Sequence, residues 1–155
     1  VDENRKPIKS TEEYIPCDTL MLSVGLIPEN ELSKSAGVNL DRITSGAEVN
    51  QDRQTNIPGI FACGNVLHVH DLVDFVSEEA EIAGRSAAEY INKQAVSDTH
   101  IKINTDGKIR YTVPQIITKN KDVTVYFRVS DVFKNVKICV YDGERMIFSK
   151  KKQLY

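Results

Sequence analysis

This 155-residue sequence has few cysteines, little net charge and no long apolar run. The three cysteines lie far apart in separate apolar stretches, so a disulfide framework is not expected and a reducing cytoplasm is the default compartment. No apolar run could cross a bilayer, and no signal peptide is present. A net charge of -2, with mixed signs, offers no basic surface for nucleic acid. These absences indicate an ordinary soluble globular protein, in one domain or two small ones.

Residues 55–65 organise the rest of the sequence. Pro58 favours an extended conformation at Ile57, and Gly59 permits a tight turn. The four residues that follow, 60–63, are all apolar, which predicts a short strand buried on both faces. Gly64 would then let the backbone approach a ligand at the carboxyl end of that strand, where open α/β sheets bind ligands.

Upstream of this stretch the sequence predicts a second buried strand and a short helix. Residues 1–13 are polar and could form the tip of a hairpin whose other arm is 14–24, with the apolar run 19–24 ending at Gly25. Residues 28–37 have proline and acids at the start and glycine at the end, as short helices do. Residues 38–49 would be irregular or a short hairpin with Gly46 at the bend, and the polar turn 50–55 would be a solvated surface.

A helix is predicted downstream, from about Asp71 to Asn92. Asp71 is a suitable N-cap, and Asp74 resembles the acidic half of a capping box. Apolar residues recur at helical spacing and should form the buried face. This face consists of Leu72, Val76, Ala80, Ala83, Ala87 and Ile91.

The apolar period changes from helical to alternating after residues 94–100, where we place a domain boundary. Four strands are predicted, at 108–114, 123–129, 136–141 and 145–149, which together would form a small antiparallel β module. Asp106-Gly107 and Asp142-Gly143 are strong turn signals, and the second should join the last two strands as a hairpin. The basic residues 150–152 would be a solvated strand end or a cut site.

Two of these segments resemble signatures of one family. Residues 55–65 fit T-x-x-P-G-I-F-A-x-G-D except at Asn65, and residues 17–29 resemble the apolar strand and glycine that precede this motif. The first is similar to the second flavin-binding signature of the pyridine-nucleotide-disulfide oxidoreductases, the thioredoxin-reductase-like flavoproteins. The β module resembles the extension found on NAD(FAD)-dependent dehydrogenases of anaerobic bacteria, a less specific match.

The resemblance implies an α+β fold in which the C-terminal part of a Rossmann-like FAD-binding domain, residues 1–97, precedes the β module, 98–155. The parent would be an FAD-dependent oxidoreductase with NAD(P)H as co-substrate. Helix dipole and free N–H groups would stabilise negative charge on a phosphate or reduced flavin, and an amide at Asn65 could bind a ribityl hydroxyl. The cofactor-binding residues would be Gly25, Gly64, Asn65, Leu72 and Val73.

The family's G-x-G-x-x-G turns are absent and the chain begins at Val1 rather than Met, so we expect a C-terminal fragment of a longer polypeptide. Alone it should be inactive, and its partner would be the missing N-terminal part. The alternative is a non-catalytic binding module that docks a partner subunit or self-associates. No membrane span or nucleic-acid partner is expected.

Three local hypotheses stay open. The cluster H-x-H-D-x-x-D, formed by His68, His70, Asp71 and Asp74, suggests a metal site, but a loop beside a cofactor is favoured because no H-E-x-x-H or C-x-x-C supports metal. One of the histidines could act on a substrate proton, although the sequence provides no partner to fix that role. Cys63 lacks a nearby second cysteine and should be buried and inert, and the same argument covers Cys17 and Cys139. Gly25 and Gly64-Asn65 could also be ordinary turns.

Overall fold

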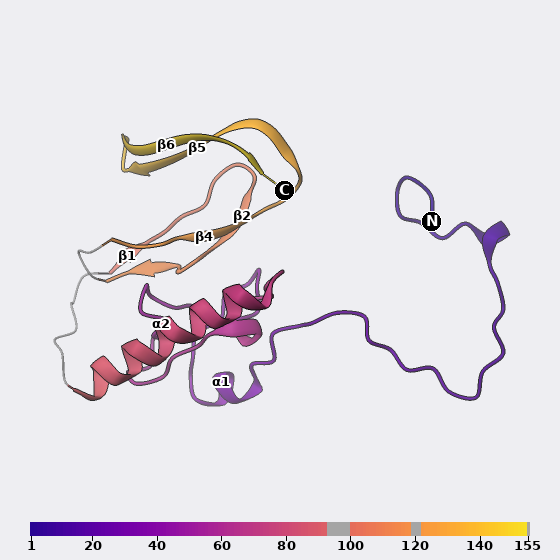
Figure 1. Ribbon diagram of the computed structural model, residues 1–155, viewed down its shortest axis with the longest axis horizontal. Coiled ribbons are helices and arrows are strands. Elements are labelled where there is room, and N and C mark those ends of the chain that lie inside the picture. The colour runs from indigo at the N-terminus through magenta and orange to yellow at the C-terminus, as the bar shows by residue number, and fades with distance from the viewer. Residues whose placement is uncertain (93–99, 119–121, 155) are drawn as a thin grey trace.

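The computed structural model describes residues 1–92, 100–118 and 122–154, and Figure 1 shows their arrangement. Two helices and two single 3-10 turns precede the strands, in agreement with an α+β chain. The helical elements are η1 (Lys9–Thr11), α1 (Glu31–Ser35), η2 (Gly64–Val66) and α2 (Val73–Ile91). The strands are β1 (Ile101–Lys102), β2 (Ile109–Val113), β3 (Ile116–Ile117), β4 (Tyr126–Val129), β5 (Phe133–Asp142) and β6 (Arg145–Leu154).

The N-terminal segment runs away from the rest of the chain (Figure 1) and forms no strand, so the strand and hairpin predicted over residues 1–24 are wrong. The segment contains η1 and a local turn, in which the Asp2 carboxylate accepts hydrogen bonds from the amides of Asn4 and Lys6. A strand needs a neighbour for its N–H and C=O groups, and no described residue pairs with this segment. Its apolar side chains are therefore exposed, Met21 by 90%.

The next segment follows the sequence prediction. Helix α1 ends as expected, with Gly37 in the left-handed region at φ +81°. Residues 38–49 form a short hairpin held by an antiparallel bridge between Leu40 and Ala47. Gly46 lies at its bend, where a Cβ atom would come within 1.6 Å of the Leu67 carbonyl oxygen. Only glycine fits there, because the two backbones touch.

The predicted strand at residues 60–63 is reduced to a single bridge between Gln54 and Phe61. The turn before it is as expected, with Gly59 at φ +84°, but all four residues are half-buried rather than buried. A strand that is apolar on both faces needs a covered sheet around it. The described residues build no such sheet around this segment, so its apolar side chains are only partly buried.

Helix α2 confirms the predicted helix but begins two residues later, and its buried side is shifted toward one edge of the predicted apolar face. Its N-cap is Leu72, without a side-chain cap bond, because the Asp71 carboxylate pairs with Arg128 instead (2.9 Å). On the predicted face only Ala83 is buried. The face also buries Glu79, a charged side chain that the apolar pattern did not include. The helix is thus rotated so that a carboxylate points inward.

The four predicted strands are confirmed as β2, β4, β5 and β6, and β1 and β3 are two short additions. They form three two-stranded antiparallel sheets, β1–β3, β2–β4 and β5–β6. Both predicted turns use glycine at positive φ: Gly107 at +68° and Gly143 at +59°. Gly143 closes the long β5–β6 hairpin, whose strand end at 150–152 is exposed as predicted.

The main apolar cluster joins the helical half to the strands. It contains Val38, Ala47, Val49, Leu67 and Val113. Beside this cluster, Gln115 forms two hydrogen bonds with Val49. The Gln115 side-chain oxygen accepts from the Val49 backbone amide, and the Gln115 backbone amide donates to the Val49 carbonyl. The two halves therefore share backbone hydrogen bonds and a core. Residues 94–99 of the boundary lie outside the described residues, and the division at 97/98 stays a prediction. No helix of the described chain has the length and apolar character to cross a membrane.

Candidate functional site

A buried ionic cluster lies beneath the elbow at Gly64. It begins in the polar turn 50–55, where the predicted solvated surface is wrong: residues 50–53 are all buried, Arg53 to 1% exposure. The turn is packed inward because its side chains satisfy backbone groups. The Asn50 side-chain oxygen accepts from the amides of Asp52 (2.9 Å) and Gln54 (3.1 Å). Arg53 is thereby directed at helix α2.

Glu79 is the centre of the cluster. Its carboxylate is 2% exposed and accepts hydrogen bonds from Arg53 Nε at 3.0 Å and from the Gly64 amide at 2.8 Å. His70 Nε2 lies 2.9 Å from the second oxygen. Burial raises the pKa of the Glu79 carboxyl, but the nearby imidazoles and the Arg53 guanidinium outweigh burial, and the pKa is lowered from its usual value. Glu79 is therefore an anion held by several donors.

The two histidine rings lie against each other at a tilt of 50°, and each points its Nε2 atom at the carboxylate. Their ring centroids are 4.1 Å apart, and the His68 ring also meets the Tyr111 ring edge-on at 5.8 Å. His68 Nε2 lies 3.5 Å from Glu79 Oε1, but neither ring nitrogen of His68 forms a hydrogen bond. The sequence paired these histidines with Asp71 and Asp74. The structure replaces both aspartates with Glu79.

The elbow itself is fixed to α2. Gly64 has φ +71° and donates its amide hydrogen to Glu79, so this N–H is not available to a ligand. The positive φ favours glycine here, because other residues rarely adopt that backbone conformation, whereas a Cβ atom would meet only a methyl group of Val76, at 3.4 Å. The Asn65 side-chain oxygen accepts from the His70 amide at 3.1 Å. Glu79 and Asn65 together hold the loop between η2 and α2.

Four of the five predicted cofactor-binding residues come together. Gly64 and Asn65 lie on η2, which packs against α2, and Leu72 and Val73 lie at the exposed start of α2. Gly25 lies apart, in the extended N-terminal segment, with no atom within 4 Å of the position its Cβ would take. The elbow and the helix start are thus joined by the short loop 67–71, and the described structure does not bring Gly25 to them.

Strand β4 reaches the start of α2 through two side chains. The Arg128 guanidinium pairs with Asp71 and donates to the Val69 carbonyl at 3.3 Å. Its pKa is raised, first by a hydrogen bond with Tyr111 and then by Asp71. The Tyr126 hydroxyl donates to Glu78 at 3.2 Å. The β2–β4 sheet thus braces the end of α2 that would face a cofactor.

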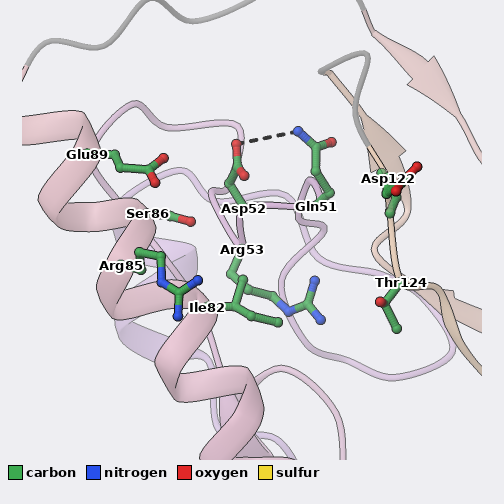
Figure 2. Close-up of a pocket in the computed structure, with 10 residues that line it drawn as sticks. Gln51, Asp52, Arg53, Ile82, Arg85, Ser86, Glu89, Asp122 and Thr124 are labelled. Carbon is green, nitrogen blue, oxygen red and sulfur yellow. Dashed lines mark hydrogen bonds between the residues drawn. The ribbon is translucent and has the colours of Figure 1, made fainter.

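A depression of about 250 Å³ lies beside the C-terminal half of α2, and Arg53 of the buried cluster is one of its lining residues. Figure 2 shows Arg85, Ser86 and Glu89 on the helix facing the turn at Asp52, with Asp122 and Thr124 at the opposite wall. Its lining carries charges of both signs and includes none of the predicted site residues. We assign it no ligand.

The cysteines behave differently from one another. Cys63 is half-buried and unpaired, and burial raises the pKa of its thiol, with a further contribution from Glu79. It is thus a poor thiolate, in line with the inert role predicted. Cys17 was expected in a buried strand but is exposed, because that strand does not form. Cys139 is half-buried in β5.

Arg53 and Glu79 were missed by the sequence reading. The signal for Glu79 was its spacing: it follows Val76 by three positions and precedes Ala83 by four, which puts it on their face of the helix. A charged residue at such a position indicates a buried partner. Arg53 gave no comparable signal, since polar turns are usually solvated.

Comparison with known proteins identifies the family. The model of the pyridine nucleotide-disulphide oxidoreductase family matches residues 1–87, more than half of the chain, and the chain belongs to this family. The match includes the elbow and most of α2, and it confirms the resemblance seen in residues 17–29 and 55–65.

Curated relatives carry related names. A mitochondrial dihydrolipoyl dehydrogenase of Caenorhabditis elegans is 32% identical over 68% of this chain and 20% of its own length. An NADH oxidase of Methanocaldococcus jannaschii is 33% identical over 43% of the chain and 14% of its own length. A ferredoxin–NADP reductase of Ignicoccus hospitalis is 34% identical over 52% and 26%. This chain therefore spans about a quarter or less of these relatives. No solved structure matches it significantly.

Proposed function

We propose that this chain forms one wall of the FAD site of an NAD(P)H-linked oxidoreductase. The observation that carries the proposal is the elbow at Gly64, fixed to α2 by Glu79 within the segment that matches the family. The names of the relatives, with NADH or NADP as partners of two of them, support the same class of reaction. FAD, when bound, would supply the hydride and electron chemistry.

The start of α2 is suited to a cofactor that becomes negative. Its 19 residues give a full helix dipole, and no side chain caps its first turn. Leu72 and Val73 are exposed there, Val73 by 75%. A reduced flavin or a pyrophosphate beside these N–H groups would be stabilised by about 0.3–1 kcal/mol or more.

The elbow residues fit this role in different ways. Asn65 is exposed, and its side-chain oxygen accepts from the His70 amide, so its side-chain NH2 group is the part that would donate to a ribityl hydroxyl. It adds no charge next to a pyrophosphate. Gly64 acts by positioning, since its amide is bound to Glu79 and its positive φ turns the chain from residue 63 into η2.

The exposed apolar surface supports a larger polypeptide around this wall. Residues 19–27 expose almost all of their apolar side chains, and the helix ends at Leu72 and Ile91 are exposed too. An apolar run as exposed as residues 19–27 is normally covered by other parts of a protein. We propose that the remaining part of the FAD and NAD(P)H domains covers it, and that this chain by itself is inactive.

A second function is favoured by the β5–β6 hairpin. Its tip exposes large apolar side chains on both strands. These are Val140, Tyr141, Met146, Ile147 and Phe148. In this alternative the chain is a docking module for a partner subunit, and the family signature is retained only as part of the fold.

Flavin content separates the two proposals. We expect the 155-residue chain alone to retain no FAD and not to oxidise NAD(P)H, whereas the longest polypeptide that its gene encodes carries one FAD per chain. Stoichiometric flavin on the chain alone contradicts the proposed incompleteness. A gene that encodes no further residues, with a chain that is monomeric, would favour the docking module.

A further inference from the structure

We propose that His68, His70 and Glu79 form a binding site for a transition-metal ion such as Zn²⁺. One ligand atom from each side chain lies within 4.8 Å of the other two. The side chains are 8%, 5% and 2% exposed, so the site lies inside the protein rather than on its surface. Two imidazoles and one carboxylate are a donor set that zinc accepts, with a fourth position left for water. This inference is independent of the flavin.

The spacing of the donors suits a tetrahedral ion. Metal–ligand bonds of about 2.0–2.1 Å place neighbouring ligand atoms about 3.3 Å apart in a tetrahedron. His70 Nε2 and His68 Nε2 lie 2.9 Å and 3.5 Å from the nearest oxygens of Glu79, on either side of this value. The two rings are already adjacent, with centroids 4.1 Å apart. Small ring rotations would bring all three donors onto one ion.

His68 provides the observation that points to a ligand. Both of its ring nitrogens are buried, and neither forms a hydrogen bond to any residue that the structure describes. Buried polar atoms are nearly always paired, because an unpaired one loses its hydration without compensation. The ring has an aromatic neighbour in Tyr111 but no polar partner except the Glu79 oxygen at 3.5 Å. A bond from one of these nitrogens to a metal ion would give the His68 ring a polar partner.

Arg53 opposes a cation at this position and so limits the affinity. Its guanidinium lies 3.0 Å from one Glu79 oxygen, and the Gly64 amide occupies a position on the other. Each carboxylate oxygen has two lone pairs, so Oε1 keeps a position for a metal, and Oε2 gains one when His70 exchanges its contact with that oxygen for a metal bond. Hydrogen-bonded carboxylates are usual among metal ligands. Neutralising Arg53 should therefore tighten binding, a result that a purely structural cluster would not give.

The test uses the full chain after treatment with EDTA. We expect Co²⁺ to give the visible absorption of a tetrahedral complex, and Zn²⁺ to displace it with one ion per chain in calorimetry. His68→Ala and His70→Ala should each weaken binding at least tenfold. His100→Ala is the matched control, because His100 is exposed and is the third of only three histidines. An absence of tetrahedral Co²⁺ bands, or an equal loss in the control, would overturn the proposal.

A measurement on the unmodified chain protects the test against unfolded variants. Zn²⁺ at about one hundred times its Kd should raise the melting temperature by about 5–10 °C. The same rise is expected for His100→Ala, and Arg53→Gln should bind Zn²⁺ at least threefold more tightly. If Zn²⁺ leaves the melting temperature unchanged, the cluster does not bind metal and serves only to fix the elbow.

Discussion

Glu79→Gln is the substitution that most clearly probes the buried cluster. The amide keeps the shape of the side chain but removes its charge, so the Arg53 guanidinium is left buried without a counter-ion. The amide nitrogen would also have to face a donor, since Arg53, Gly64 and His70 surround both positions. Breaking a buried ion pair in this way costs about 3–5 kcal/mol.

The loss should be large compared with the total stability of a domain, which is about 5–15 kcal/mol. For a chain of this size it corresponds to a fall in melting temperature of about 6–20 °C. Circular dichroism during thermal and urea unfolding would measure it. Replacing both partners, with Arg53→Met and Glu79→Leu, should cost less than Glu79→Gln alone because no charge stays unpaired.

Glu81→Gln is the matched control, two residues away on the same helix. Glu81 pairs with Arg85 one turn later, but its side chain is 70% exposed. Exposed pairs of this kind contribute about 0.3–0.5 kcal/mol. If the free energy of unfolding of Glu79→Gln lies within about 1 kcal/mol of the wild-type value, Glu79 is not a buried anion. The proposed role of Glu79 in holding the Gly64 amide is then refuted as well.

Further predictions concern glycines and cysteines. Gly46→Ala should destabilise the chain by about 1–3 kcal/mol or more, because the added Cβ atom would overlap the Leu67 carbonyl. Gly84→Ala in α2 should stabilise the chain by about 0.5–1 kcal/mol, because its Cβ atom would meet no described atom within 4 Å. The midpoints of denaturant unfolding would therefore shift in opposite directions for the two variants. At pH 8 iodoacetamide should modify Cys63 more slowly than Cys17, because the raised pKa of the Cys63 thiol leaves less thiolate and its side chain is half-buried. Peptide mass spectrometry would follow the modification of both cysteines. Equal rates would contradict the raised pKa of Cys63.

Local signals in the sequence predicted local structure well. The helix α2, the hairpin around Gly46 and the Gly143 turn each depend on residues close together in the chain, and each is present. The family signature was recognisable for the same reason, because it is a continuous run of residues.

Features that depend on distant partners could not be predicted in this way. The apolar run 19–24 indicates that the segment can be buried in a sheet, but pairing needs a neighbouring strand, and the described residues provide none. Arg53 and Glu79 are 26 positions apart, so the polar pattern at 50–55 could not show that its arginine is buried on a helix. His68 and His70 were noticed, but their third partner lay on the next helix rather than in the loop.

The central claim is that a flavin lies at the start of α2. The most direct test is to measure the FAD content of a matched pair of α2 variants, made in the longest polypeptide that the gene encodes. Val73 and Ile91 are equally exposed, at 75% and 76%, at opposite ends of α2. Val73→Asp suits a helix start but places a negative charge where the flavin would lie. We expect it to weaken FAD binding at least tenfold, while Ile91→Asp leaves it unchanged. Equal FAD binding by both variants would contradict a flavin at the start of α2.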